Sequence, residues 1–253
     1  MSATAKLEHS EMSSAEWRAR CDLAALYRIV DHFGWTDIIN THMSARVPDE
    51  PGTFLINHYE EMFHEITASS LIKMDFEGKV LGKQGPFNAA GFTIHSGVYK
   101  ARPDAMCVMH THTRAGAGVS MVRNGIRPIS QDALNVLDEV AYHEYGMPAT
   151  QEECDALGIS CNKGTCVVLL NHGLLAHAPT IHGTLQRLYM LERACELELI
   201  SRTLGEPPVE IEPSVVEGVA VYMKAARAKP DYGLHEWNAL LRVIEGRGRD
   251  YRV

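Results

Sequence analysis

Two histidines, His110 and His112, lie two residues apart where the apolar run AMCVMHTHT (residues 105–113) ends. Successive side chains alternate faces on a β-strand, so these two would point the same way, with their Cα atoms roughly 6–7 Å apart. Two imidazoles in that arrangement can converge on one metal ion. The alternative is a pair of ordinary histidines on the solvated face of a strand, and the spacing alone does not separate the two.

A third histidine, His172, follows a second apolar run, CVVLL (166–170), within the triplet Asn171-His172-Gly173. The glycine would let the backbone turn and would leave room around the ring. Three neutral imidazoles leave a coordination position open for water or substrate, which is the arrangement of a catalytic metal site. Taken alone, His172 can also be a turn histidine that hydrogen-bonds to its neighbours.

The bulk composition limits the classes of partner. The 253-residue chain has a net charge of −8 with its lysines and arginines scattered, which argues against a nucleic-acid or anionic-membrane surface. No apolar run approaches the roughly 20 residues that span a bilayer, and the N-terminal stretch MSATAKLEHSEMSS is polar where a secretory signal would be apolar. We therefore expect a cytoplasmic protein that acts on a small molecule.

Helix-like and strand-like segments surround these histidines. Ser13 and Glu16 have the capping-box spacing at the start of a helical pattern, and Phe76-Glu77-Gly78 has the character of a hairpin turn. The chain thus indicates a single α/β domain over residues 1–205, and a C-terminal extension, 206–253, that packs on the same domain or on a neighbouring subunit. The expected helices cover 13–34, 89–103 and 180–205, with a further one in the small-residue stretch 113–125 and one in the C-terminal extension. The expected strands cover 44–47, 54–57, 72–82, 105–112 and 166–170.

Several motifs occur together in one order: ARPD followed by HTHT, then ISQDAL, VAYHEY and NHGLLA. This combination resembles the class II aldolase/adducin family over roughly residues 20–205. The resemblance implies a three-layer α/β/α domain with a largely antiparallel central sheet, assembled as a homotetramer with sites between subunits. It also implies that His110, His112 and His172 hold a divalent metal, with zinc expected first and manganese, cobalt or iron as alternatives.

The chain departs from the sugar-phosphate aldolases of that family at the site. Gly91 stands where those enzymes carry a glutamate near the metal, four residues before His95. The stretches Asn57-His58-Tyr59 and Asn88-Ala89-Ala90 replace the residues that hold phosphate in those enzymes. Both losses bring the sequence close to the adducin branch. A sugar phosphate is therefore not the expected substrate.

A metal held by three histidines can stabilise the enolate left when a carbon–carbon bond breaks, so we expect a lyase that acts on a small non-phosphorylated oxygenated acid or carbonyl compound. Decarboxylation is favoured slightly over retro-aldol cleavage, because it needs only an electron sink and an acid. Two other functions stay open: a non-catalytic adducin-like assembly module and a metal-dependent oxygenase. The candidates for proton transfer, each of which could equally have a structural role, are Tyr142, His143, Glu144, His95 and Gln131, with His42 and His58 as further possibilities.

Overall fold

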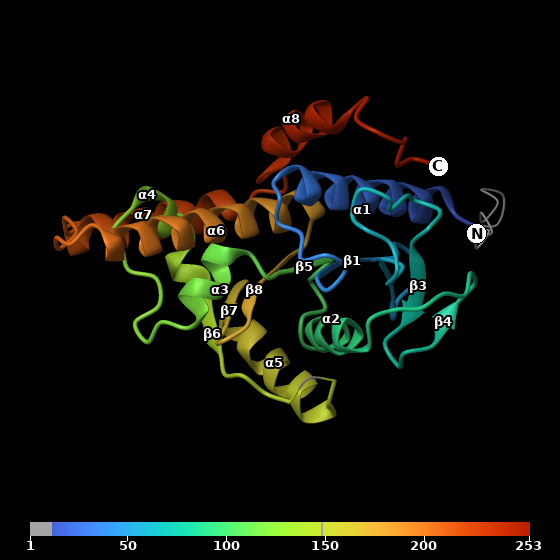
Figure 1. Cartoon of the computed structure of the whole chain (residues 1–253), viewed down its shortest axis with the longest axis horizontal. Coiled ribbons are helices and arrows are strands. Elements are labelled where there is room, and N and C mark those ends of the chain that lie inside the picture. The colour runs from blue at the N-terminus through green and yellow to red at the C-terminus, as the bar shows by residue number, and fades with distance from the viewer. Residues whose placement is uncertain (1–11, 148) are drawn as a thin grey trace.

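The central feature of the protein, in a computed structural model that describes residues 12–147 and 149–253, is an eight-stranded sheet. The strand order is β4-β3-β2-β1-β5-β8-β7-β6 (Figure 1). All neighbouring strands are antiparallel except β6 and β7, which are parallel. The strands are β1 (His42–Arg46), β2 (Thr53–Ile56), β3 (Ile72–Asp75), β4 (Val80–Leu81), β5 (Cys107–Thr111), β6 (Val140–His143), β7 (Cys166–Leu169) and β8 (Gly173–Ala178).

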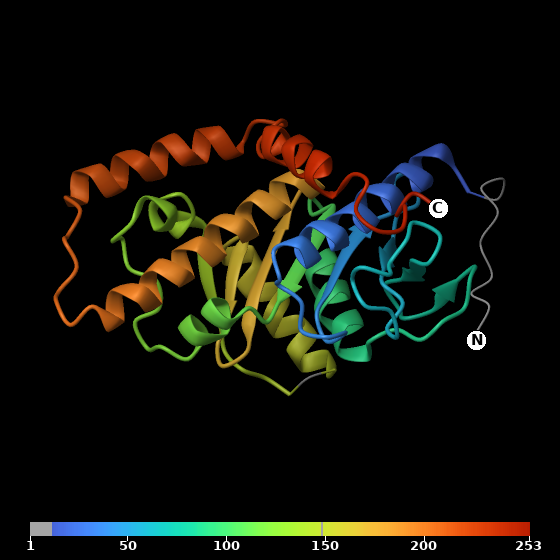
Figure 2. The same ribbon diagram turned by 45° about the horizontal axis from the view of Figure 1, so that its top comes forward.

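Helices cover both faces of this sheet. On one face lie α1 (Ser14–His32) and α6 (Ile181–Thr203), and on the other α2 (Ala89–Ala101) and α5 (Gln151–Lys163) (Figures 1 and 2). The predicted three-layer α/β/α domain with a largely antiparallel sheet is therefore confirmed. The remaining helices are α3 (Arg114–Ser120), α4 (Gln131–Leu134), the 3-10 helix η2 (Leu137–Glu139), α7 (Pro213–Arg227) and α8 (Leu234–Ile244).

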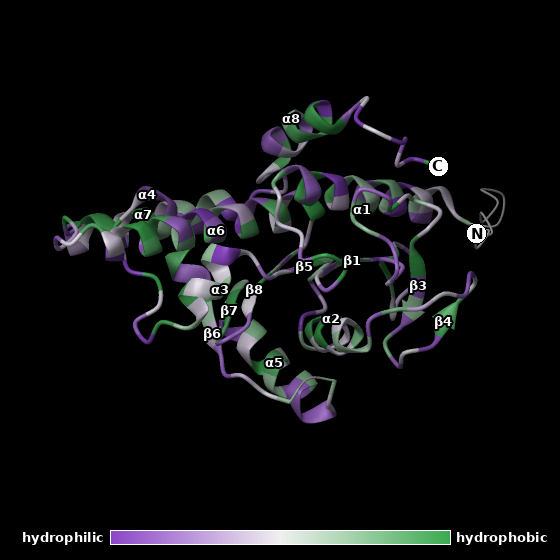
Figure 3. Cartoon of the chain, in the orientation of Figure 1, coloured by the Kyte–Doolittle hydropathy of each residue, from purple (hydrophilic) through white to green (hydrophobic). Residues whose placement is uncertain are grey.

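Two hydrophobic cores result from the alternation of side chains along the strands. In β5, Cys107 and Met109 pack into the core beneath α1 and α6, whereas Val108 packs into the core beneath α2 and α5. The covering helices carry hydrophilic and hydrophobic residues along the same element (Figure 3), as expected for one buried face and one solvated face. His110 has the same parity as Val108, so its ring lies on the side of the sheet that α2 covers.

Several elements of the structure are not predicted by the sequence pattern, among them β6, α5 and β8. All six residues of β8 are buried, so the strand shows no alternation of apolar and polar residues and cannot be distinguished by period. The predicted first helix and the hairpin at Phe76–Gly78 are present. Ser13 caps α1 by accepting a hydrogen bond from the Glu16 amide at 3.0 Å.

The C-terminal extension contains two helices, where the sequence indicates one. Trp237 and Ile244 of α8 are buried in the core beside α1 and α6, and the Ala68 amide donates to the Tyr251 carbonyl at 2.7 Å. The domain boundary at residue 205 stays a prediction. Residues 1–11, which include most of the polar N-terminal stretch, lie outside the described residues. Within the described chain, none of the helices combines the length and apolarity needed to cross a bilayer.

Candidate metal centre

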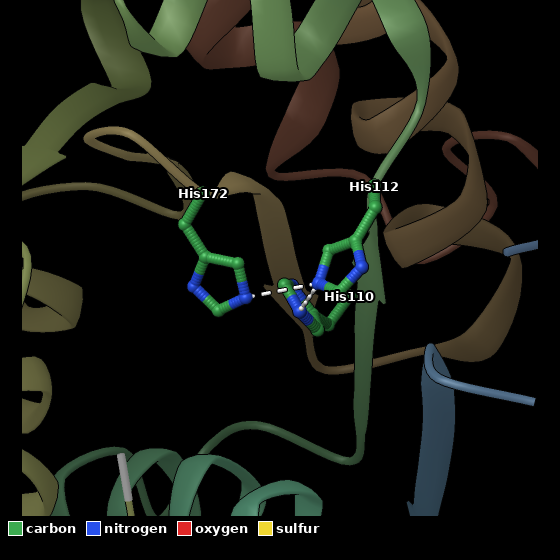
Figure 4. A group of neighbouring side chains, drawn as sticks. All are labelled: His110, His112 and His172. Atoms are coloured by element: carbon green, nitrogen blue, oxygen red, sulfur yellow. Dashed lines mark hydrogen bonds between the residues drawn. The ribbon is translucent and has the colours of Figure 1, made fainter. Parts of the chain in front are cut away.

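Three imidazoles meet at one end of the sheet (Figure 4). His110 lies near the end of β5, His112 lies just beyond that end, and His172 lies in the turn between β7 and β8. The Nε2 atom of His112 is 2.9 Å from Nε2 of His110 and 2.9 Å from Nε2 of His172. The three ligand atoms all lie within 4.8 Å of one another, so the structure brings together the residues that the sequence indicates.

The other ring nitrogens of this triad hold the rings in place. Nδ1 of His110 is 2.9 Å from the Leu174 carbonyl, and Nδ1 of His112 is 2.9 Å from Oδ2 of Asp37. A hydrogen bond donated outward from Nδ1 fixes the tautomer and leaves the Nε2 lone pair for a metal, which is the usual outer-sphere arrangement of metal-binding histidines. In a tetrahedral zinc site the nitrogens would be about 3.3–3.4 Å apart, so the two pairs at 2.9 Å need to separate only slightly.

Burial keeps two of these imidazoles neutral. Burial lowers the pKa of His110 well below its usual value, and the neighbouring histidines lower it further. Burial, with smaller contributions from His112 and His143, lowers the pKa of His172 to about 4. A neutral imidazole has a free lone pair near pH 7, so the donor set fits a divalent metal of the zinc type.

The turn that carries His172 depends on neighbours on both sides. Asn171, with φ of 58°, provides the left-handed backbone conformation, so the expectation that Gly173 makes the turn is wrong. Gly173 is needed for close approach: a Cβ there would lie 2.4 Å from the Thr111 carbonyl oxygen and 3.2 Å from the His112 ring. Ser120 holds the turn, because its hydroxyl and its carbonyl accept from the His172 and Asn171 amides, each at 3.1 Å.

A cavity of about 300 Å³ opens beside the triad. Its lining, taken over the described residues, contains no lysine or arginine. Asn88 accepts hydrogen bonds from the amides of Ala90 and Gly91 at 3.0 and 3.2 Å, so these N–H groups at the start of α2 are not free to hold an anion. The lining residues are Asn40, His42, Asn88, Ala90, Thr93, Ile94, His110, His112, His143, Glu144, Tyr145, Gly146, Ala149, Glu153, Leu169, Leu170 and His172.

A buried hydrogen-bonded chain begins at this cavity with His42, which is paired with His110 across β1 and β5. Nδ1 of His42 is 2.7 Å from Nε2 of His95, and Nδ1 of His95 is hydrogen-bonded to Oγ of Ser44. The chain ends at Tyr99, whose hydroxyl is 2.8 Å from that Oγ. His95 itself does not line the cavity, so His42 is the member of the chain that meets a bound molecule.

The ring of His42 also fills the space beside Gly91. A Cβ at Gly91 would lie 2.7 Å from Cδ2 and 2.8 Å from Nε2 of His42. Such contacts are too short for these atoms, so a side chain at residue 91 and the present position of His42 exclude each other. The imidazole therefore occupies the volume that a side chain at residue 91 would need.

His143 lies on the opposite wall of the cavity, at the end of β6. Its Nε2 is 3.0 Å from Oε1 of Glu153 and its Nδ1 is 3.0 Å from Oγ of Ser160, both on α5. Glu144 also lines the cavity. Of the residues expected to transfer protons, His42, His143 and Glu144 thus line the cavity beside the triad.

The other expected residues lie outside the cavity lining. The Tyr142 hydroxyl accepts from the Ile126 amide at 2.9 Å, and Gln131 is exposed at the start of α4. His58 packs against Gly85. Asn57, in the stretch compared with a phosphate site, is buried and accepts from the Tyr27 hydroxyl at 2.8 Å.

Two residues of the site are absent from the sequence interpretation: Asp37, which holds His112, and Glu153, which holds His143. Asp37 is 75 residues from His112 in the chain, in the loop after α1. No local pattern of residues links such distant partners, so only the tertiary structure identifies them. The position of Glu153 in the first turn of a helix is typical of an ordinary N-terminal acid.

Residues 21–199 match the family model for the class II aldolase and adducin N-terminal domain. A Pseudomonas aeruginosa protein named provisionally as a class 2 aldolase is 41% identical over 248 residues, which cover 96% of this chain and 95% of that protein. Alpha-adducin of Rattus norvegicus is 41% identical over 191 residues, which cover 74% of this chain but 26% of the adducin. The structure of L-fuculose 1-phosphate aldolase from Glaciozyma antarctica PI12 superposes with a TM-score of 0.82 at 25% identity, covering 98% of this chain and 96% of that one.

Proposed function

The chain belongs to the class II aldolase and adducin family, and from that premise we propose that it is a metal-dependent carbon–carbon lyase for a small oxygenated acid or carbonyl compound without phosphate. The observation that carries the proposal is the convergence of three Nε2 atoms at a cavity of about 300 Å³. A structural metal site would normally close with a fourth protein ligand, whereas the cluster formed by the described residues consists of His110, His112 and His172 alone.

A divalent metal, zinc first, would supply Lewis-acid stabilisation of the oxyanion that develops on the substrate when the carbon–carbon bond breaks. The protein's own groups support the choice of substrate. The cavity offers asparagine, histidine and glutamate side chains but no lysine or arginine among its described lining residues. Because phosphate is usually bound by such cations or by free helix amides, and Asn88 occupies the amides, a sugar phosphate is disfavoured.

Proton transfer is assigned to the histidines that face the cavity. His42 hydrogen-bonds to His95 through Nδ1, and burial lowers the pKa of His42, so its ring is neutral. As its Nε2 gives a proton to the substrate carbon, its Nδ1 would take one from His95, whose own Nδ1 is hydrogen-bonded to Ser44. His143 is the second candidate, and it would have to exchange its hydrogen bond to Glu153 for one to the substrate.

Gly91 offers no carboxylate base beside the triad, which suits decarboxylation better than retro-aldol cleavage, and Glu144 in the cavity lining is the alternative base. Tyr142 and Gln131 lie outside the cavity of their own chain. They would take part in proton transfer only where a neighbouring subunit of a homotetramer brings them to the site.

The deciding experiment is a substrate screen of the metal-loaded protein against hydroxy-aromatic carboxylates and sugar phosphates, with carbon dioxide and aldehyde release followed separately. Carbon dioxide release that is lost in His42→Ala would support the decarboxylase. Aldehyde release from a non-phosphorylated substrate would support a lyase, but one that catalyses retro-aldol cleavage and not decarboxylation. Efficient cleavage of a sugar phosphate would contradict the assigned substrate class.

A second candidate function is a non-catalytic assembly module, and the 41% identity to alpha-adducin is the observation that favours it. A module of that kind would bind partner proteins through surfaces built by the helices and would not need the triad. His112→Ala would then leave partner binding intact, and the wild type would turn over no substrate in a broad screen. Stoichiometric metal together with turnover would exclude this candidate.

A further inference from the structure

A second cavity, of about 330 Å³, lies at the end of the sheet remote from the triad. It is bounded by residues that precede β5 and β7 and by the start of α6, whereas the triad follows β5 and precedes β8. The segment from α7 to Tyr232 closes its outer side. We call it the α6–α7 cavity, and its lining is Arg102, Asp104, Glu139, Thr165, Pro179, Thr180, Gly183, Arg187, Lys224, Arg227, Ala228, Lys229 and Tyr232.

The charges of the α6–α7 cavity are unbalanced. Five basic side chains and two carboxylates line it. Both carboxylates are already engaged: Arg102 binds both oxygens of Asp104, at 2.8 and 2.7 Å, and Glu139 accepts from Arg187 at 2.9 Å and from Thr165 at 2.7 Å. The lining therefore carries a positive charge that its own carboxylates do not neutralise.

Two of the basic groups, Lys224 and Lys229, form no ion pair with any acidic residue in the described part of the chain. They stand on either side of Arg227, at the end of α7 and just beyond it. Both lysines are exposed, so their ammonium groups are free to pair with an anion that enters the cavity.

A buried donor without an acceptor completes the argument. The Tyr232 hydroxyl is shielded from solvent and has no hydrogen-bond partner. Arg227 is by contrast already paired: its guanidinium donates to the Asn135 carbonyl and forms ion pairs with Asp138 and Glu139. An unsatisfied buried donor costs free energy, so such a group in a native structure requires an explanation. A ligand with acceptor oxygens would satisfy the Tyr232 hydroxyl.

The N-terminus of α6 adds to the positive electrostatic potential of the cavity. Thr180 and Gly183 line the cavity, but the Thr180 hydroxyl accepts from the Gly183 amide, so that amide is not free to hold an anion. The dipole of this 23-residue helix still places partial positive charge at that end. Unpaired cations, a buried donor and the positive end of a helix dipole together suit a phosphate group.

We propose that the α6–α7 cavity is a binding site for a phosphate group, carried either by inorganic phosphate or by a small phosphate ester. The site is separate from the triad, and its occupation does not require the proposed lyase activity. The phosphate oxygens would accept from the Lys224 and Lys229 ammonium groups and from the Tyr232 hydroxyl. Inorganic phosphate would occupy only the part of the cavity beside these donors, whereas a phosphate ester would also fill the rest of it.

The test is calorimetric titration of the full-length protein with inorganic phosphate and, separately, with glycerol 3-phosphate. Saturable binding is expected, and the double variant K224Q/K229Q should lower the affinity about tenfold or more, since it removes two charge-assisted hydrogen bonds. Y232F, which keeps the ring that lies 5.2 Å from the Arg187 guanidinium, should lower the affinity by a smaller factor without unfolding the protein. Tighter binding of the ester would assign a small ester as the ligand, and equal binding would assign the phosphate group alone.

The matched control is K79Q/R123Q, which removes the same charge from two exposed positions outside the cavity and should leave the affinity unchanged. His112→Ala should also bind phosphate normally, which separates this site from a metal at the triad. The proposal is overturned if the wild type shows no saturable binding, if K224Q/K229Q binds as well as the control, or if binding is lost in His112→Ala. A fall in native mass of K224Q/K229Q without phosphate binding would instead make this face a contact between subunits.

Discussion

Nδ1 of His112 and Oδ2 of Asp37 form a hydrogen bond of 2.9 Å, which ties one candidate metal ligand to the loop that follows α1. The Asp37 carboxyl is 42% exposed, whereas the His112 side chain is 23% exposed. This partly exposed hydrogen bond therefore contributes little to the stability of the fold. Its main consequence is the orientation of the imidazole, because the donated Nδ1–H leaves Nε2 pointing at His110 and His172.

Asp37→Ala is expected to weaken metal binding about 10–100-fold while the protein stays folded, since the change removes only the group that orients His112. Asp37→Asn keeps an acceptor oxygen and should lose less. The measurement is competition for zinc against a chelator of known affinity. As a control, Asp49→Asn changes a turn at the far end of β1 and should match the wild type. Equal affinities for all four proteins would show that Asp37 does not act on the metal centre.

His112→Ala is expected to abolish stoichiometric metal and turnover while folding and assembly survive, because the core is built from the apolar strands and helices around the triad. Elemental analysis, thermal unfolding and native mass are measured on one preparation. His64→Ala, an exposed histidine between β2 and β3, serves as the control. A His112→Ala variant as active as the wild type would contradict the proposed enzyme, and an unfolded variant would indicate a structural metal.

Gly91→Ala is expected to destabilise the protein by about 1–3 kcal/mol, because the new methyl would lie 2.7 Å from the buried ring of His42. His42→Ala removes that ring, so the double variant H42A/G91A should lose less stability than the sum of the two single variants. Urea denaturation of the four proteins gives the coupling free energy. Strict additivity would show that His42 moves aside without cost.

Glu192 gives a pH dependence of stability. Burial raises the pKa of this carboxyl to about 7, partly offset by the hydrogen bond from Thr113. The folded protein therefore holds a proton between about pH 4.5 and 7 that the unfolded chain has released, and the free energy of unfolding falls as the pH rises through that range.

Glu192→Gln should remove this dependence. The stability difference between the wild type and Glu192→Gln is expected to change by about 3 kcal/mol between pH 4.5 and 7 and to stay level above pH 7. The free energy of unfolding of the wild type and of Glu192→Gln is measured at pH 5 and pH 7.5. The change that both proteins share is subtracted as background. A pH profile identical for the two proteins would show that the carboxyl titrates normally.

The homotetramer that we propose would have a native mass four times 28.1 kDa. Helix α7 supports association, because Arg227 is its only buried residue while Val221 and Tyr222 are 73% and 71% exposed. Light scattering at micromolar concentration measures the mass. Val221→Asp should shift the protein toward smaller species without loss of helical content if α7 is an interface. A wild-type mass near 28.1 kDa would contradict the tetramer.

The sequence alone was sufficient to place the main helices, several strands and the three histidines. Their signals are local: a capping residue, an apolar period, or a histidine where an apolar run ends. Ser13 shows this, since its capping-box spacing with Glu16 predicts the start of α1 directly. The family motifs then supplied the three-layer architecture, which no local period contains.

Only the tertiary structure decided how these residues meet. Strand β8 is buried on both faces and has no period, so its pairing with β5, which brings His172 to His112, is not visible in the chain. The links from Asp37 to His112 and from Gly91 to His42 join residues far apart in sequence whose types are ordinary when taken alone. Such contacts depend on the packing of whole elements, because a hydrogen bond or a shared volume exists only after the layers have assembled.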